Sequence, residues 1–315
     1  WIVHKAAGAG LAGFLLRGTL WSAEKVYRAR LDETVKVPIT AQIVYKLCAG
    51  LRVKIRKTLF GSEFKYAVSG GAKLNSDVAR FLDMFDIQVL EGYGLTETCV
   101  ATNANRPGKN KIGTVGPVLS SDIEIKLGAD QEILFKGPNI AKGYYNRPSA
   151  TKHAWSEDGW FSSGDLGSLD SDGYLKIEGR KKEIIVTSYG KNIAPESVEQ
   201  ELKTSKYISQ AVLVGDGRPY CVALITLNLS AVQKWAQTNG HQIGEEIADN
   251  SEVRRLIHSE IERINGSLAN FESVKKFFLV SDEFTIDNGL LTPTFKVKRK
   301  AVQERFQQQI DRLYS

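Results

Sequence analysis

The chain has 315 residues, of which 42% are apolar and 25% are charged, and its formal net charge is +6. This composition is typical of a globular protein of about two domains and argues against intrinsic disorder. The basic charge suits a nucleotide, CoA or an anionic membrane surface, but no zinc-finger or RNP-like motif accompanies it, so nucleic-acid binding is not expected.

The cysteines and histidines are few and scattered. Cys48, Cys99 and Cys221 are odd in number and form no CxxC pair, and the four histidines show no metal-ligand spacing. The sequence therefore predicts neither a disulfide framework nor a zinc site. A reducing, cytoplasmic compartment is the default for this usage, with a location peripheral to a membrane left open.

The first sixty residues are expected to be mainly helical. The chain opens on Trp1, not on Met, which suggests a fragment. Residues 6–16 (AAGAGLAGFLL) are too short to span a bilayer and are interpreted as a small-residue helix that packs on the core or lies on a surface. The basic run at 52–57 is interpreted as a solvated helix face, with a membrane-facing patch as the alternative.

The next segments follow the pattern of an α/β sheet. Residues 64–68 read as a buried strand that enters a glycine turn, residues 76–85 as a helix, and residues 87–90 as a second strand that ends in the loop Glu91–Gly94. Ligands of such sheets bind beyond the carboxyl ends of the strands.

From 112 to 178, short alternating runs between turn signals predict a compact antiparallel β region, and a domain boundary is expected near Gly179–Lys182. A smaller α/β unit follows. Pro195 should begin a helix that runs to about Lys203, and residues 211–227 should form a hairpin.

Ser251 is expected to cap a further helix in that unit. The apolar residues of this helix recur at helical spacing and are interpreted as core: Val253, Leu256, Ile257, Ile261, Ile264 and Leu268.

The segment Glu91–Thr98 (EGYGLTET) carries the strongest chemical signal. Its glycines let the backbone approach a ligand and donate to phosphate oxygens. Tyr93 offers a flat face on which a base can stack, and Thr96 offers a hydroxyl. Glu97 offers a hard oxygen ligand, and Mg²⁺ typically uses one or two carboxylates together with substrate phosphates.

This octet resembles the signature loop of the adenylate-forming superfamily, which includes the acyl-CoA synthetases. Residues 69–74 (SGGAKL) are similar to the family's adenine-binding loop. Residues 159–165 (GWFSSGD) resemble the motif whose aspartate, here Asp165, receives both ribose hydroxyls. Ser162-Ser163 stand where many relatives carry His-Thr.

Three later motifs extend the resemblance. Residues 173–183 resemble the interdomain hinge motif, which makes Arg180 a ribose and phosphate contact and Lys182 the hinge. Residues 188–196 look like the loop that lines the CoA tunnel, through Ser188, Tyr189 and Gly190. Residues 291–299 resemble the C-terminal motif whose lysine, here Lys296, reaches the acyl carboxylate and the α-phosphate.

The resemblance implies ATP/AMP, Mg²⁺ and CoA as cofactors. The catalytic residues are then Lys296, Thr96 and Glu97, with Glu97 the metal ligand. The implied nucleotide-binding residues are Gly71, Ala72, Lys73, Glu91, Gly92, Tyr93, Gly94, Thr96, Asp165 and Arg180.

The implied architecture is α/β. Residues 1–181 would form the C-terminal part of a large adenylating domain, with an α/β sheet and an antiparallel β region. Residues 182–315 would form a small mobile α+β domain. The helical, basic start and the motifs 190–195 and 292–296 resemble long-chain fatty acyl-CoA synthetases in particular, with a fatty acid and CoA as substrates.

Two alternatives stay open: an acyl-AMP ligase that delivers to a carrier protein, and a non-catalytic binding module of the same fold. The Ser/Thr/Gly-rich loop that cradles the ATP β- and γ-phosphates is not found, so the chain alone is expected to be inactive or nearly so. Acyl chain length and homodimer formation are left open.

Overall fold

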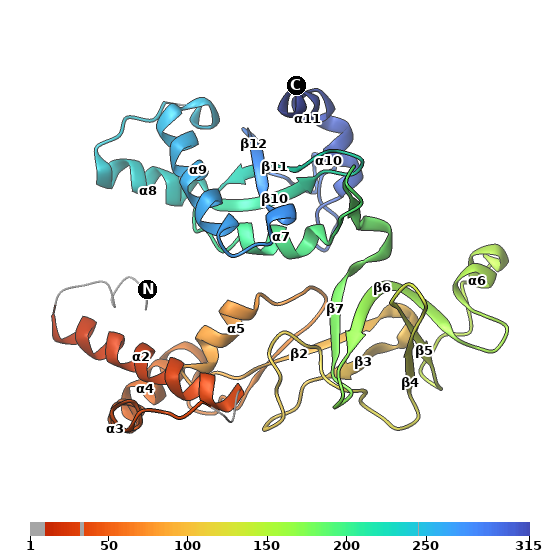
Figure 1. Cartoon of the computed structure of the whole chain (residues 1–315), viewed down its shortest axis with the longest axis horizontal. Helices are drawn as coiled ribbons and strands as arrows, with labels where there is room; N and C mark the ends of the chain where they lie inside the picture. The colour runs from red at the N-terminus through yellow and green to blue at the C-terminus, as the bar shows by residue number, and fades with distance from the viewer. Residues whose placement is uncertain (1–9, 32–34, 245) are drawn as a thin grey trace. The chain divides into compact units, whose positions relative to one another are not determined.

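The computed structural model describes residues 10–31, 35–244 and 246–315. These residues group into two compact units (Figure 1). The first unit contains the described residues up to Leu127, with Leu134–Ser163 and Ser168–Ile177. The second contains Gly128–Ile133, Gly164–Gly167 and Glu178–Ser315.

The first unit begins with three helices, α2 (Leu11–Leu31), α3 (Ile39–Leu47) and α4 (Ala49–Phe60), drawn in red and orange in Figure 1. They confirm the helical prediction for the described part of the first sixty residues. Leu16 and Ile55 pack with Phe85 and Ile87 in a buried cluster. The four residues at 6–9 of the predicted small-residue helix lie outside the described residues.

The basic run at 52–57 was predicted to be a solvated helix face. The prediction is wrong for Arg52, because this residue is buried. Its Nε lies 3.0 Å from Asp86 Oδ2, its Nη1 donates to the Tyr45 carbonyl, and its guanidinium covers the Tyr45 ring. A buried arginine needs such partners, since burying an unpaired charge is costly. No described helix is both long and apolar enough to cross a membrane.

A three-stranded sheet with the order β1-β2-β3 follows. β1 (Ala67–Ser69) runs parallel to β2 (Val89–Leu95), and β3 (Val100–Ala104) pairs with β2 antiparallel. The predicted strand at 64–68 is therefore shifted to 67–69, and the prediction that it is buried is wrong, because Val68 is 74% exposed on this edge strand.

The helix predicted at 76–85 is confirmed as α5 (Ser76–Asp83). Asn75 caps it, since its side-chain oxygen accepts from the backbone N–H groups of Asp77 and Val78. The predicted loop Glu91–Gly94 is instead the middle of β2, because β3 pairs with it.

Four further strands form one sheet in chain order: β4 (Glu124–Leu127), β5 (Glu132–Lys136), β6 (Phe161–Leu169) and β7 (Leu175–Arg180). Residues 128–131 and 170–174 are too short for a parallel crossover, so β4–β5 and β6–β7 are antiparallel pairs. This agrees with the predicted β region. The short helix α6 (Pro148–Ala154) lies between β5 and β6 in the chain.

The second unit is built on the sheet β10-β11-β12, whose strands are Ile208–Val214, Cys221–Leu227 and Val274–Val280. The predicted hairpin is confirmed, because β10 and β11 pair antiparallel; β12 pairs parallel to β11. β11 is buried along its whole length. Its alternate side chains enter two separate buried clusters, with Ala223 and Ile225 in one and Leu224 in the other.

Helices cover both faces of this sheet. The first cluster contains residues of α7 (Pro195–Leu202), α8 (Leu229–Asn239) and α9 (Ser251–Asn265), and the second contains residues of α10 (Arg299–Arg305) and α11 (Gln307–Tyr314). Pro195 begins α7 as predicted. The short pair β8 (Ile185–Val186) and β9 (Asn192–Ile193) precedes α7.

The apolar stripe predicted for α9 is confirmed, because Val253, Ile257, Ile261 and Ile264 are buried. The cap assigned to Ser251 is wrong. Asn250 caps the helix, and its side-chain oxygen accepts from the backbone N–H groups of Glu252 and Val253.

Candidate functional site

The pairing of β2 with β3 requires a glycine at 94 and leaves little room for a side chain at Gly92. A Cβ on Gly94 would lie 1.4 Å from the Val100 carbonyl oxygen, a distance that no side chain can accommodate. A Cβ on Gly92 would meet the Asn103 carbonyl oxygen at 3.3 Å. The sequence interpretation assigned these glycines to phosphate contacts, and the structure shows that strand packing alone already demands Gly94.

Glu91 joins the two segments assigned to the nucleotide. Ser69 pairs with Glu91 across β1 and β2, and the Glu91 carboxylate accepts the Leu74 backbone N–H at 2.8 Å. Burial raises the pKa of this carboxyl, and the Leu74 N–H opposes the rise. The loop that carries Gly71, Ala72 and Lys73 is thereby fixed beside β2.

The loop itself leaves Gly71 and Ala72 exposed and Lys73 half-buried. Gly71 has a φ of +82°, a left-handed conformation that glycine adopts at little cost. The exposed backbone at these positions is the part of the loop open to a ligand.

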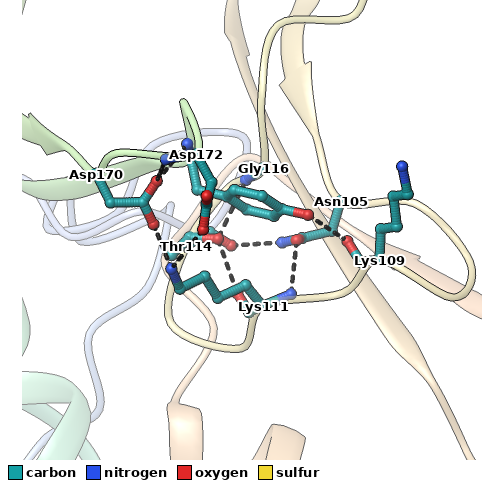
Figure 2. Close-up of polar contacts among 8 residues, drawn as sticks. Asn105, Lys109, Lys111, Thr114, Gly116, Asp170 and Asp172 are labelled. Atoms are coloured by element: carbon teal, nitrogen blue, oxygen red, sulfur yellow. Dashed lines mark hydrogen bonds and ion pairs between the residues drawn. The ribbon is translucent and has the colours of Figure 1, made fainter. Parts of the chain in front are cut away.

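Asn105 supports Glu91 from within the protein, and sequence reasoning missed it. Its backbone N–H donates to the Glu91 carbonyl at 2.9 Å. Figure 2 shows its side-chain amide, which donates to the Thr114 carbonyl and accepts the Lys111 N–H. The Lys111 ammonium in turn pairs with Asp170. No local pattern marks Asn105, because its contact with Glu91 spans 14 residues and the Lys111–Asp170 pair spans 59.

The turn after β2 is the 3₁₀ helix Thr96–Thr98. Thr98 is fully buried, and its hydroxyl accepts the Leu95 N–H at 2.9 Å. Cys99 and Val100 follow with φ values of 49° and 82°. A positive φ at a β-branched residue is unfavourable, which indicates that the surrounding contacts over-determine this turn.

Within this turn Thr96 is exposed and Glu97 is half-buried. Tyr144 donates its phenol hydroxyl to Glu97 Oε1 at 2.7 Å, and this contact raises the pKa of Tyr144. Tyr144 is the second site residue that sequence reasoning missed, again because the contact is long-range. The Tyr93 ring stacks on Phe135 with centroids 6.1 Å apart, so one of its faces is already covered.

In the second unit, Asp165 and Arg180 lie together. Asp165 is buried in β6, where alternate residues are buried, and its Oδ1 lies 2.9 Å from Arg180 Nε. The Asp165 side chain is only 8% exposed, whereas that of Arg180 is 51% exposed. The structure thus brings together the two residues assigned to the ribose.

Ion pairs of Lys181 hold the segment that follows Arg180. Lys181 Nζ lies 2.5 Å from Asp130 and 2.8 Å from Glu132, and these carboxylates raise its pKa. Lys182, the residue assigned to the hinge, is exposed in the 3₁₀ helix Lys181–Glu183.

The residues assigned to the CoA tunnel form an exposed turn between β8 and β9. The Gly190 N–H donates to the Thr187 carbonyl at 2.8 Å, with a φ of +72° at Gly190. Ser188 donates its backbone N–H to the Arg218 carbonyl, and Tyr189 is 76% exposed.

Lys296 lies in another exposed turn of the second unit. The Thr292 N–H donates to the Lys296 carbonyl at 2.8 Å, and the Lys296 N–H donates to the Thr292 hydroxyl at 3.0 Å. Phe295 in the same turn is exposed with a φ of +60°. The backbone of Lys296 thus closes the turn through its two hydrogen bonds with Thr292, and its side chain is exposed to solvent.

Comparison with known proteins shows two family matches. Residues 24–145 match the family described as AMP-binding enzyme, and residues 182–315 match the AMP-binding enzyme C-terminal domain. The chain belongs to the family of AMP-binding enzymes. Its fold is that of an adenylation domain: the adenylation domain of a carboxylic acid reductase from Segniliparus rugosus superposes with a TM-score of 0.68 at 21% identity, over 94% of this chain and 45% of that one.

Curated AMP-binding enzymes with similar sequences are fatty acid ligases. The long-chain-fatty-acid–CoA ligase FadD15 of Mycobacterium bovis is 40% identical over 265 residues, which are 83% of this chain and 44% of the relative. The peroxisomal long chain acyl-CoA synthetase 6 of Arabidopsis thaliana is 34% identical over 82% of this chain and 40% of its own length. The chain thus spans less than half the length of these relatives.

Proposed function

We propose that the chain contributes to the ATP-dependent activation of a long-chain fatty acid through acyl-AMP to acyl-CoA. The observation that carries the proposal is the fixed pairing of the loop 70–74 with the signature strand through Glu91, followed directly by the exposed Thr96 and the carboxylate of Glu97. The long-chain substrate rests on the names of the relatives.

Within the first unit, we assign Gly71, Ala72 and Lys73 to the adenine, together with the backbone of Glu91–Gly94. Thr96 is assigned to a phosphate oxygen. Within the second unit, Asp165 is suited to the ribose hydroxyls, because its buried carboxyl oxygens can accept hydrogen bonds and lie beside the Arg180 guanidinium.

Glu97 is the residue that would hold Mg²⁺. The fit is chemical: Glu97 is half-buried and offers a hard carboxylate oxygen, and Mg²⁺ is typically bound by one or two carboxylates together with substrate phosphates. When bound, the ion would neutralise charge on the phosphates.

In the first half-reaction the fatty acid carboxylate oxygen attacks the α-phosphorus of ATP. A bond forms between this oxygen and the α-phosphorus, which gives the mixed anhydride acyl-AMP, and the bond from the α-phosphorus to the oxygen bridging the β-phosphate breaks, so that pyrophosphate leaves. Both reactants are anionic, so catalysis depends on positioning and on charge neutralisation. The exposed ammonium of Lys296 is assigned to the carboxylate and the α-phosphate in this step.

In the second half-reaction the CoA thiol loses its proton and its sulfur attacks the acyl carbon, and AMP leaves with the former carboxylate oxygen. We assign residues 182–315 to a domain that rotates about Lys182 between the steps, so that Lys296 is replaced by the turn of Ser188, Tyr189 and Gly190. Hinges of this kind lie at the ends of elements, as Lys182 does between β7 and β8.

The test is a chain-length series of fatty acids given to the complete natural polypeptide with ATP, with either CoA or a phosphopantetheinyl carrier protein as acceptor. Formation of acyl-CoA with long-chain acids supports the proposal. Transfer only to the carrier would make the protein an acyl-AMP ligase, and nucleotide binding without release of pyrophosphate would make it a binding module.

A further inference from the structure

Residues 139–144 clamp the turn that carries Glu97. Three hydrogen bonds reach this turn from a segment some forty residues downstream. Asn139 donates its side-chain amide to the Thr98 carbonyl at 3.0 Å, Ala141 donates its N–H to the Glu97 carbonyl at 2.8 Å, and Tyr144 donates its hydroxyl to Glu97 Oε1 at 2.7 Å. The first two fix the backbone of the turn, and the third fixes the carboxylate.

Tyr144 is itself held in place. Its backbone N–H donates to the Thr151 hydroxyl at 2.9 Å, and its ring lies edge-on to Trp155 with centroids 5.2 Å apart. Gly143 packs so closely on Thr151 that a Cβ there would lie 2.5 Å from the Thr151 methyl carbon. A side chain locked by packing and by a second hydrogen bond presents its hydroxyl in a fixed position.

We propose that Tyr144 is a positioning residue that makes Glu97 a one-oxygen metal ligand and so favours Mg²⁺ over Ca²⁺. The proposal rests on the proposed function, in which Glu97 holds the cation that accompanies ATP. It adds a residue that neither the sequence motifs nor the family resemblance pointed to.

The chemistry follows from the two oxygens of Glu97. Oε1 accepts the phenol hydrogen, and among the described residues Oε2 takes part in no hydrogen bond or ion pair. While Tyr144 donates to Oε1, that oxygen is the weaker ligand of the two, and Oε2 is the oxygen better able to bind a cation. Mg²⁺ takes an octahedral shell at short distance and commonly binds one carboxylate oxygen, whereas Ca²⁺ takes six to eight ligands and readily uses both oxygens of a carboxylate.

Tyr145 provides a matched control. It is the adjacent residue, has the same side chain, and is 92% exposed. Removing the Tyr145 hydroxyl measures the effect of losing a phenol oxygen at a neighbouring position while the hydrogen bond from Tyr144 to Glu97 stays intact. Tyr144→Phe removes the hydrogen bond to Glu97 and keeps the ring that packs on Trp155.

The experiment measures the dissociation constants of ATP from the complete natural polypeptide by equilibrium dialysis, in MgCl₂ and in CaCl₂. The readout is the ratio of the calcium value to the magnesium value. Tyr144→Phe should lower this ratio about threefold to tenfold, the range expected for one ordinary hydrogen bond. Tyr145→Phe should leave the ratio unchanged, and Glu97→Gln should bring it close to one.

The outcomes separate the two claims. A ratio that collapses in Glu97→Gln but survives in Tyr144→Phe overturns the role of Tyr144 and leaves the metal role of Glu97 standing. A ratio that survives in Glu97→Gln overturns the metal assignment itself.

Discussion

The Arg299 guanidinium forms a bidentate ion pair with the Glu199 carboxylate, with Nη1–Oε1 at 2.6 Å and Nη2–Oε2 at 2.9 Å. The same two side chains satisfy Leu213 on the edge strand β10: Glu199 accepts its N–H at 2.6 Å, and Arg299 donates to its carbonyl at 3.2 Å. The pair therefore takes the place of a neighbouring strand at this position.

Arg299→Met should destabilise the protein by about 3 kcal/mol, because it leaves the Glu199 carboxylate buried without its partner. Urea unfolding measures the loss, and hydrogen exchange of residues 208–214 should quicken with it. Lys300→Met is the control, since Lys300 is 89% exposed, and it should change stability by less than about 0.5 kcal/mol.

The double variant Arg299→Met/Glu199→Leu should recover much of the loss, because replacing both partners of a buried pair by apolar residues removes the unpaired charge. A double variant that is no more stable than Arg299→Met would show that the cost comes from lost packing and not from the charge.

Asn250→Ala should destabilise the second unit by about 1 kcal/mol, the usual cost of losing an N-cap. Ser251→Ala should have little effect, because the cap bonds come from Asn250. Thermal or urea unfolding of the two variants side by side checks this. If Ser251→Ala were the more destabilising of the two, Ser251 would be the cap, as the sequence suggested.

Glu91→Gln should change how stability depends on pH. Burial raises the pKa of Glu91 above its ordinary value of 4.5. The folded protein therefore holds this proton to higher pH than the unfolded chain does, and stability falls as pH rises from about 4.5 through the folded-state value.

Glutamine removes this loss and can still accept the Leu74 N–H. Relative to the wild type, Glu91→Gln should therefore gain stability between pH 4 and pH 7, measured by urea unfolding at both values. The exposed Glu157, changed to Gln, serves as the control. If the stability gain of Glu91→Gln over the wild type were larger at pH 4 than at pH 7, the expected direction of the pH dependence would be wrong.

Local sequence signals predicted the elements whose cause is local. Pro195 set the start of α7, the turn at 215–219 set the hairpin, and apolar spacing set α9. These features depend on backbone restrictions and on helical or strand periodicity within a few residues.

The predictions were wrong where contacts with distant segments of the chain determine the structure. The glycines at 92 and 94 read as a loop, but pairing with residues 100–104 makes them strand. Arg52 read as solvated, but Asp86 pairs with it. Asn105 and Tyr144 carry no local signal, because each acts on a residue of the signature segment through a contact that only the folded chain creates.

Lys296→Ala should cripple the first half-reaction and largely spare the second. The ammonium is assigned to the charge that develops between the fatty acid carboxylate and the α-phosphate, and the loss of such a group typically costs about 10²–10³ in rate. Formation of acyl-AMP is measured by pyrophosphate release, and thioester formation is measured from supplied acyl-AMP.

Lys298→Ala is the control for Lys296, since Lys298 is also exposed in the same segment. Equal loss of both half-reactions in Lys296→Ala would remove the assignment of this lysine to adenylation.

Lys182→Pro should block the second half-reaction and leave the first. Proline fixes its own φ near −65° and drives the preceding residue toward extended conformations, so a hinge at this position could no longer change its dihedral angles. Lys182 directly follows Lys181, whose ammonium is held by Asp130 and Glu132.

Rapid-quench measurement of acyl-AMP and acyl-CoA in a single turnover checks this. Lys182→Pro should accumulate acyl-AMP, whereas Lys182→Ala, which removes the charge and keeps the backbone free, should convert it to acyl-CoA. If Lys182→Pro carries out both steps at the rate of Lys182→Ala, the rotation does not depend on the dihedral angles of this residue, and the hinge must lie elsewhere in the segment that joins β7 to β8.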